Sequence, residues 1–164
     1  MKIKEQIENL NFHDSEFREI RIQLTGPDTT CIVDLDYYNW EGNEGNQAGD
    51  PWKWKRLLMK FNFMGHIEYS LPDLVNGAKF IYNIEIDYNL DRFIEARDKL
   101  KKDFPLAKYP LFKENEETIS IKFNVCNWDD HDNGFIWIVG SGVELEWIDD
   151  DTLQGQTHVP IKSE

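Results

Sequence analysis

The sequence predicts an α+β, mostly β domain with an antiparallel twisted sheet, as a partly open barrel or a sandwich, of about seven or eight strands and one main helix near residues 90–103. Three observations lead to this fold class. Many short segments alternate apolar and polar residues with a period of two. Only one longer segment has helical spacing, and strands and helices do not alternate as a parallel sheet requires. The 164 residues fit a single domain, 1–164.

The N-terminal segments predict a short helix and a hairpin. Apolar residues in 3–10 recur at helical spacing, which indicates a short helix. Residues 19–24 and 31–37 each alternate, so we expect two half-buried strands. Gly26 and Pro27 stand between them and favour a turn, so the two strands are expected to pair as a hairpin.

The middle of the chain contains the longest predicted loop. Residues 38–51 break every periodicity and include three glycines, three asparagines and one proline. Loops of this length are usually functional or flexible. Alternation resumes at 57–63, and further strands are expected at 66–71 and 80–88.

The C-terminal part predicts the main helix and the remaining strands. Residues 90–103 carry an apolar stripe and charges at i,i+4 spacing, both typical of a helix. Alternating strands follow at 119–125 and, as two separate strands, within 135–148. Asn133 and Gly134 are typical of a hairpin turn, which would join the strand at 119–125 to the strand that begins at residue 135.

Charge and composition narrow the class of partner. The net charge is −13, and residues 111–164 carry 12 acidic but only 3 basic side chains. Such a surface repels phosphate, which argues against nucleic-acid binding, and it would attract a basic protein. Because no apolar run suits a bilayer span or a secretory signal, we expect a cytoplasmic protein without membrane contact. Cys31 and Cys126 lie in strand patterns and are expected to be buried free thiols.

The segment His13-Asp14-Ser15 looks most like chemistry. If a strand begins at Asn11, His13 and Asp14 point to opposite faces of the sheet and do not share a metal. His13 and Ser15 then stand about 6.6 Å apart, beyond the ~3 Å that proton transfer requires. We therefore expect a structural role, in which Asp14 or Ser15 bonds backbone groups where the strand begins.

A second cluster, Asp129 to Ile136, imitates a calcium-binding loop. The glutamate required at the twelfth position is absent, because Gly140 stands there. A solvated hairpin turn explains the cluster, and no specific catalytic motif occurs elsewhere. We therefore predict no catalytic residue, no metal and no cofactor, although a site that combines His13, His66 and His131 in space stays open.

Residues 52–56, Trp-Lys-Trp-Lys-Arg, mix aromatic and basic side chains. Such a mixture suits stacking on single-stranded nucleic acid, but the net charge of −13 disfavours that partner. We expect an ordinary strand with its tryptophans on the core face and its lysines outside.

Short motifs within residues 11–70 carry a resemblance to a known family. A Phe-His-Asp-Ser segment leads into an I-x-I-x-L strand, and V-D-L-D-Y and F-N-F-M-G strands follow. In this region the chain resembles small bacterial immunity-type proteins of polymorphic toxin systems and their uncharacterised relatives. The resemblance implies a cytoplasmic protein that binds and blocks a toxin domain without chemistry of its own, and it supplies no catalytic residues.

These inferences lead to a non-catalytic immunity protein that neutralises a toxin domain, for which a basic nuclease is one candidate. Its predicted partner-binding surface is acidic, lies mainly in the C-terminal third with help from the long loop, and comprises Asp129, Asp130, Asp132, Glu144, Glu146, Asp149, Asp150, Trp40, Glu41 and Glu44. Val143, Leu145 and Trp147 are expected to face the core, opposite Glu144 and Glu146.

Two alternatives stay open. A small-ligand-binding β domain would use an aromatic-lined cavity that draws on Trp40, Trp52 and Trp54. An enzyme would use a cleft that holds His13 or His131 beside ionisable partners.

Overall fold

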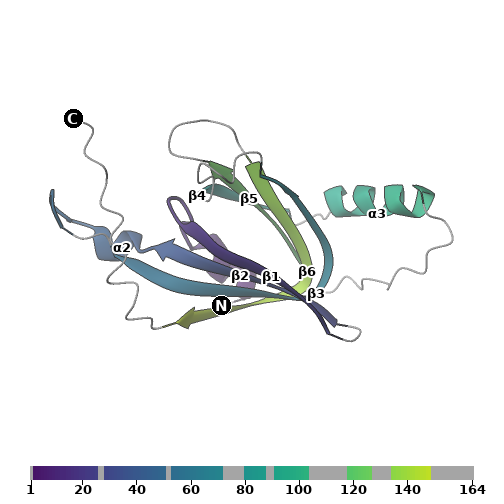
Figure 1. The fold of residues 1–164 in the computed structure, drawn as a ribbon, viewed down its shortest axis with the longest axis horizontal. Coiled ribbons are helices and arrows are strands. Elements are labelled where there is room, and N and C mark those ends of the chain that lie inside the picture. The colour runs from purple at the N-terminus through teal and green to yellow at the C-terminus, as the bar shows by residue number, and fades with distance from the viewer. Residues whose placement is uncertain are drawn as a thin grey trace.

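The computed structural model describes residues 2–25, 28–50, 53–71, 80–87, 91–103, 118–126 and 134–148. Within these ranges the elements run in the order α1 (Ile3–Glu8), β1 (Glu16–Thr25), β2 (Asp28–Tyr38), α2 (Trp40–Asn43), β3 (Trp54–Ser70), β4 (Phe80–Ile86), α3 (Asp91–Asp103), β5 (Ile119–Cys126) and β6 (Gly134–Ile148) (Figure 1).

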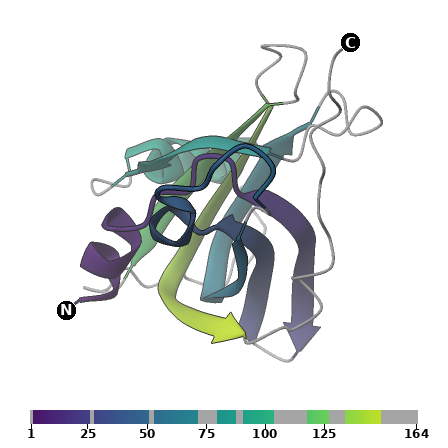
Figure 2. The ribbon, with the colours of Figure 1, turned by 90° about the vertical axis from the view of Figure 1, so that its left-hand side faces the viewer.

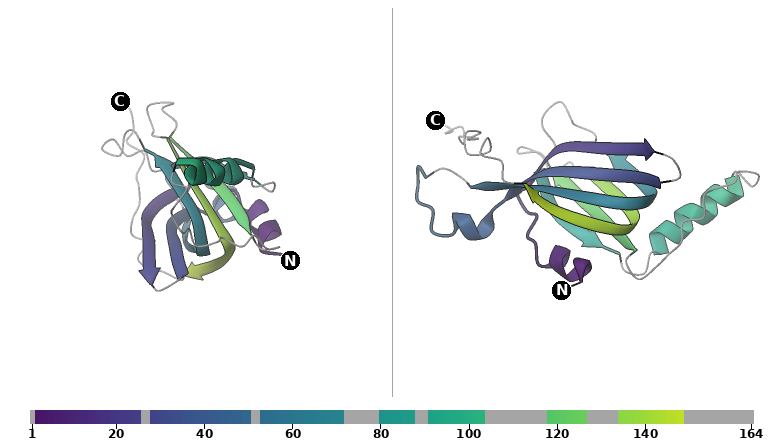
Figure 3. Two further views of the ribbon diagram at one scale, coloured as in Figure 1. Left: turned by 90° about the vertical axis from the view of Figure 1, so that its right-hand side faces the viewer. Right: turned by 90° about the horizontal axis from the view of Figure 1, so that it is seen from below.

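The strands form one antiparallel sheet that curls into a ring, with hydrogen-bonded neighbours in the order β1-β2-β3-β6-β5-β4 (Figure 3). The first and last strands meet at one register pair, Glu16 with Phe80. Next to it, the N–H of Asp14 donates to the Ile81 carbonyl (3.0 Å) and the N–H of Ile81 donates to the Ser15 carbonyl (2.8 Å). No further pair joins β1 to β4 in the described ranges, so the ring is only partly closed. The predicted class, mostly β with an antiparallel sheet, is confirmed.

Two strands are longer than the alternation predicts. β3 passes through a bulge between Met64 and His66, so the strands expected at 57–63 and 66–71 are one element. β6 likewise joins the two strands expected within 135–148, and Figure 2 shows how strongly it bends. The described ranges therefore hold six strands, where the sequence predicts seven or eight.

β6 begins one residue earlier than predicted, at a glycine that was expected in the hairpin turn. β5 and β6 pair antiparallel as expected, but Gly134 already lies in β6, opposite Val125. A Cβ at Gly134 would lie 2.6 Å from the Ser70 carbonyl oxygen, so glycine is needed there for the close approach of the strands. Asn133 lies outside the described residues.

The core fills the inside of the ring. Buried side chains alternate along the strands as the period-two pattern predicts, and they include Val33, Leu35, Leu57, Met59, Phe61, Ile121, Phe123, Ile136 and Ile138. Each large one contributes about 1.5–3 kcal/mol through burial. Ile7 of α1 is fully buried against them, which confirms the predicted N-terminal helix. Cys31 is a buried free thiol as predicted, whereas the free thiol of Cys126 is only partly buried.

α3 is the predicted main helix, and its bounds match the expected 90–103 within a residue. It lies beyond one end of the ring rather than on a face of the sheet (Figures 1 and 3). The ring is therefore built and filled mainly by strands.

Strand ends depart from the simple alternation. Trp54 pairs with Tyr38 on the outer face, whereas Lys55 pairs with the buried Tyr37. The expected facing of residues 52–56 is therefore reversed at these two positions, and Trp52 lies outside the described ranges. Trp147 shares the inner face but lies at the rim, 44% exposed, with its ring 5.3 Å from that of Tyr37. Only the positions within the closed part of the ring become core.

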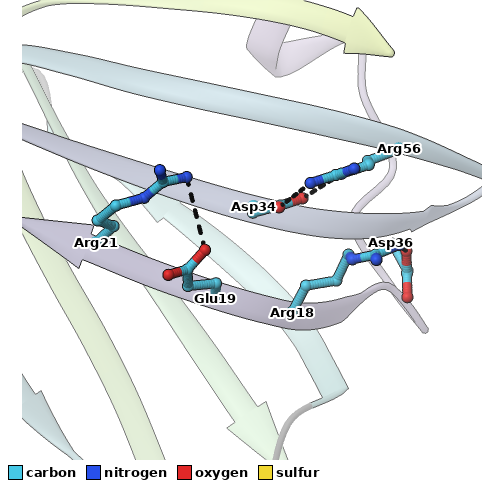
Figure 4. A network of polar contacts seen from close by, with 6 residues as sticks. All are labelled: Arg18, Glu19, Arg21, Asp34, Asp36 and Arg56. Atoms are coloured by element: carbon cyan, nitrogen blue, oxygen red, sulfur yellow. Dashed lines mark hydrogen bonds and ion pairs between the residues drawn. The ribbon is translucent and has the colours of Figure 1, made fainter. Parts of the chain in front are cut away.

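The outer face of β1, β2 and β3 carries a network of ion pairs (Figure 4). Arg56 donates from Nε and a terminal nitrogen to the two carboxylate oxygens of Asp34, at 3.0 and 2.7 Å. The Asp34 side chain is only 4% exposed, although the alternation predicts a solvent-facing position. Two more exposed pairs flank it, Arg18 with Asp36 (3.0 Å) and Arg21 with Glu19 (3.5 Å). The covering Arg56 side chain explains why this outward carboxylate is buried.

Candidate functional site

The turn that contains His13 and Asp14 is anchored by its buried neighbours. Phe12 is part of the core. Ser15 is fully buried, and its Oγ accepts a hydrogen bond from the backbone N–H of Tyr38 (3.1 Å). Because both neighbours point inward, the turn presents His13 and Asp14 to solvent. The backbone-bonding role expected of Asp14 or Ser15 falls to the Ser15 side chain.

Asp14 has a left-handed backbone, with φ at 66°. Aspartate tolerates this conformation better than most residues, and the side-chain oxygen of Asn11 supports the turn by accepting from the N–H of His13 (3.1 Å). The geometry brings His13 Nδ1 to 3.0 Å from Asp14 Oδ1, with both side chains about half exposed. The prediction that the two lie on opposite faces of a strand is wrong, because the strand begins at Glu16.

The long loop after β2 is locally structured. Asn39 caps α2 by accepting a hydrogen bond from the N–H of Gly42 (3.2 Å). Asn43 at the other end of α2 is buried, accepts from the N–H of Lys53 (2.7 Å) and donates to its carbonyl (2.9 Å). These bonds tie α2 to the start of β3 and thereby hold Trp40 in place.

Rings from five segments form a continuous cluster that we call the aromatic patch: Tyr82 of β4, His13 of the turn, Trp40 of α2, Tyr38 of β2 and Trp54 of β3. Successive ring centroids are 5.6, 6.0, 4.9 and 5.2 Å apart. The indole N–H of Trp40 donates to the His13 carbonyl (3.0 Å). Trp40 is 39% and Tyr82 55% exposed. Exposed apolar clusters of this kind mark interaction sites.

Carboxylates border the aromatic patch on the side of α2. Asp14 lies in the turn, and Glu41 and Glu44 are exposed on and after α2. Burial raises the pKa of the Tyr38 hydroxyl, and the negative charge of Asp14 raises it further, so this hydroxyl stays a neutral hydrogen-bond donor. Lys53 is exposed on the β3 side. The border is therefore mixed in charge, with an acidic excess.

The predicted acidic surface is described only in part. Glu144 and Glu146 are exposed on the outer face of β6, as expected. Glu144 accepts a hydrogen bond from the side chain of Asn62 (2.6 Å) and lies 3.9 Å from the Lys60 ammonium, so its charge is partly offset. The other predicted acidic residues of the C-terminal third lie outside the described residues: Asp129, Asp130, Asp132, Asp149 and Asp150.

Sequence reasoning named Trp40, Trp54 and His13 as candidate site residues but missed Tyr38 and Tyr82. Plain alternation puts Tyr82 on the face of Ile84, but a bulge between Ile81 and Asn83 changes the register. Tyr82 is therefore exposed beside the turn. The bulge has no clear signal in the sequence. The outward facing of Trp54 could have been predicted, because the buried apolar residues of β3, Leu57, Met59 and Phe61, alternate and put Trp54 on the opposite face.

The described histidines do not converge. His66 contacts Trp137 (4.7 Å between rings) and lies 3.5 Å from Glu68, whereas His13 contacts Trp40 and Tyr82. His131 and His158 lie outside the described residues. Within the described ranges, no three His, Cys, Asp or Glu side chains are placed to hold a metal ion. The His13–Asp14 pair has the geometry of a general base and its orienting carboxylate, but both groups are open to water.

A scan against protein-family models found no match, and searches of curated proteins and of solved structures found none either. The resemblance to immunity-type proteins therefore stays a prediction. In the part of the chain that the structure describes, no helix combines the length and apolar character needed to span a membrane.

Proposed function

We propose that this protein is a non-catalytic cytoplasmic binding protein of the immunity type, which neutralises a basic toxin domain through the aromatic patch and the carboxylates around it. The observation that carries the proposal is the patch itself, which is exposed yet held by hydrogen bonds from the turn and α2. Tyrosine and tryptophan are enriched at protein interfaces and in their energetic centres. Rigid aromatic side chains also lose little conformational entropy on binding.

Electrostatics favours a basic partner. Asp14, Glu41 and Glu44 border the aromatic patch, and the whole chain carries a net charge of −13. Glu146 projects from the same outer face and pairs with Leu58 of β3. Leu58 lies four residues along β3 from Trp54, a distance of about 13 Å between these two residues. An ordinary interface covers about 800 Å² per partner, roughly 30 Å across, so one partner spans both features. A toxin that binds nucleic acid needs a basic surface and complements this one.

The proposal predicts that a toxin-like domain is encoded beside the gene for this chain, and the test uses that domain, purified as an inactivated variant. Trp40→Ala should weaken its binding by at least about 2 kcal/mol, or roughly thirtyfold, as expected for an aromatic residue at the centre of an interface. Tyr69→Ala is the matched control, because Tyr69 is 69% exposed but lies on β3 away from the patch, and its affinity should stay within twofold. Equal affinities for both variants and the wild type contradict the proposal.

Charge variants separate the two acidic regions. Glu41→Gln with Glu44→Gln should slow association about tenfold at low salt, since steering by charge acts on the association rate. Joint neutralisation of Glu144, Glu146, Asp149 and Asp150 tests the C-terminal share in the same assay. If the association rate changes neither with salt concentration nor with these substitutions, an acidic interface is excluded.

The His13–Asp14 pair is the specific observation that favours a second function, an enzyme with acid–base chemistry. His13→Phe separates the two, because it removes the imidazole that such an activity needs but keeps an aromatic ring in the patch, so toxin binding should stay within a few fold. The small-ligand alternative has less support, since Trp40 and Trp54 lie outside the ring and do not line its interior.

A further inference from the structure

Among the residues that the structure describes, one edge of β1 has no strand partner along most of its length. β1 pairs with β2 on one side from Glu16 to Thr25. On its other side it meets β4 only at the register pair of Glu16 with Phe80. From Phe17 onward, no described strand pairs with that edge. The backbone groups of such an edge are a template for another extended chain.

An exposed apolar row runs along this free edge. Ile20, Ile22 and Leu24 share the inner face, and Leu24 is 78% and Ile22 43% exposed, because β1 leaves the closed part of the ring here. The predicted burial of this row is therefore wrong beyond Ile20. Natural edge strands are protected by proline, bulges or inward-pointing charges, and the segment 19–25 has none of these. Its charged residues, Glu19 and Arg21, point outward and pair with each other (3.5 Å).

We propose that the β1 edges of two copies of this chain pair antiparallel about a two-fold axis at Ile22, and so form a homodimer. The reason is self-complementarity of the segment 19–25. With this axis, Ile22 lies opposite the partner's Ile22, and Ile20 lies opposite the partner's Leu24. The whole apolar row then meets an apolar row, as cross-strand pairing favours.

The charged face is compatible with the same register. Arg21 lies opposite the partner's Gln23, so no like charges face each other. A shift by one residue would place the apolar row opposite the polar face. An axis at Ile20 would place Arg18 opposite the partner's Ile22 and leave Leu24 unmatched. The axis at Ile22 is the register that pairs all three residues of the apolar row with one another and opposes no like charges, and a second copy is the partner that supplies this match.

This dimer is independent of the proposed function. The aromatic patch lies at the start of β1, beside Glu16, whereas the exposed apolar row leads to Thr25 at its other end. Nine steps of extended chain separate these ends by about 30 Å. Pairing of the β1 edges therefore leaves the patch accessible to a toxin domain.

Sedimentation equilibrium on the full chain tests the association. The wild type should show a concentration-dependent dimer, and Leu24→Lys should raise its dissociation constant more than tenfold by placing a charge in the apolar row. Because Leu24 is exposed, the variant should keep its fold, and its thermal unfolding checks this. Tyr69→Lys is the control, since it changes a similarly exposed side chain on β3 and should leave the dissociation constant within twofold. A wild type that stays monomeric up to about 1 mM, or a dimer that Leu24→Lys does not weaken, overturns the proposal.

Cysteine pairing tests the register. Arg21→Cys and Gln23→Cys are made separately in a Cys126→Ser background, and the proteins are oxidised alone and as a mixture. In the proposed register the two new thiols lie opposite each other across the axis, with Cβ atoms about 4.5–5.5 Å apart, near the range of a disulfide. Identical thiols are about 8 Å apart, which is too far. Cross-linking should therefore appear mainly in the mixture, and equal cross-linking in all three samples contradicts the register.

Discussion

Replacing Arg56 by methionine should lower the free energy of unfolding by about 3–5 kcal/mol, the usual effect of leaving a buried charge without its partner. The Asp34 side chain is only 4% exposed and receives two hydrogen bonds from Arg56, at 3.0 and 2.7 Å. A hydrogen bond to a charged group contributes about 1.5–3 kcal/mol, so the loss of two agrees with this range. Methionine keeps most of the packing of the arginine stem and isolates the electrostatic effect.

Two further variants make the measurement specific. Arg21→Met removes a pair in which both side chains are about half exposed, and it should change stability by only about 0.2–1 kcal/mol. Asp34→Leu combined with Arg56→Met removes both buried partners and should be close to neutral, because no unpaired charge remains. Urea unfolding, with the midpoint and slope fitted together, gives all four free energies. A loss below about 1 kcal/mol for Arg56→Met, or a double variant that is no more stable than Arg56→Met alone, refutes the reasoning.

Four other predictions concern the turn and the thiols. Ser15→Ala should destabilise by about 1–3 kcal/mol in the same urea assay, because the N–H of Tyr38 loses its acceptor, while Ser15→Thr, which keeps a hydroxyl, should lose less. Asp14→Ala should lose about 1 kcal/mol and Asp14→Gly little, because φ at 66° suits glycine, and equal losses would contradict the role of backbone strain. Burial raises the pKa of the Cys31 thiol to about 11, so a thiol reagent at pH 8 should label Cys126 first and Cys31 only on unfolding. Since that pKa is raised from 9.0, the contribution of Cys31 to stability should persist below pH 9 and decline as the pH approaches 11, and a Cys31→Val variant should lack this decline.

Several features could be predicted from the sequence because they depend on neighbouring residues alone. The alternation in β2 identifies Val33 and Leu35 as core, and both are fully buried. The helical stripe and its charges place α3 within a residue of its observed bounds. Burial with a period of two or 3.6 is a local property of the chain, so the elements and the antiparallel class can be read directly from the residue pattern.

The candidate site depends on the tertiary structure. Trp40 and Tyr82 meet His13 only because the turn at Asp14 and the bulge after Ile81 direct three separate segments to one place. The position of Asp34 likewise depends on an arginine 22 residues away.

The sequence by itself determined which residues form strands and helices and which of their faces are apolar, because these follow from periodicity within each segment. Only the tertiary structure decided where the ring stays open, which outward side chains gather into the aromatic patch, and that the Asp34 carboxylate is covered. The physical reason is that strand register, bulges and left-handed turns are set by contacts between distant segments. A shift of one residue in any of them moves a side chain from one face of the sheet to the other.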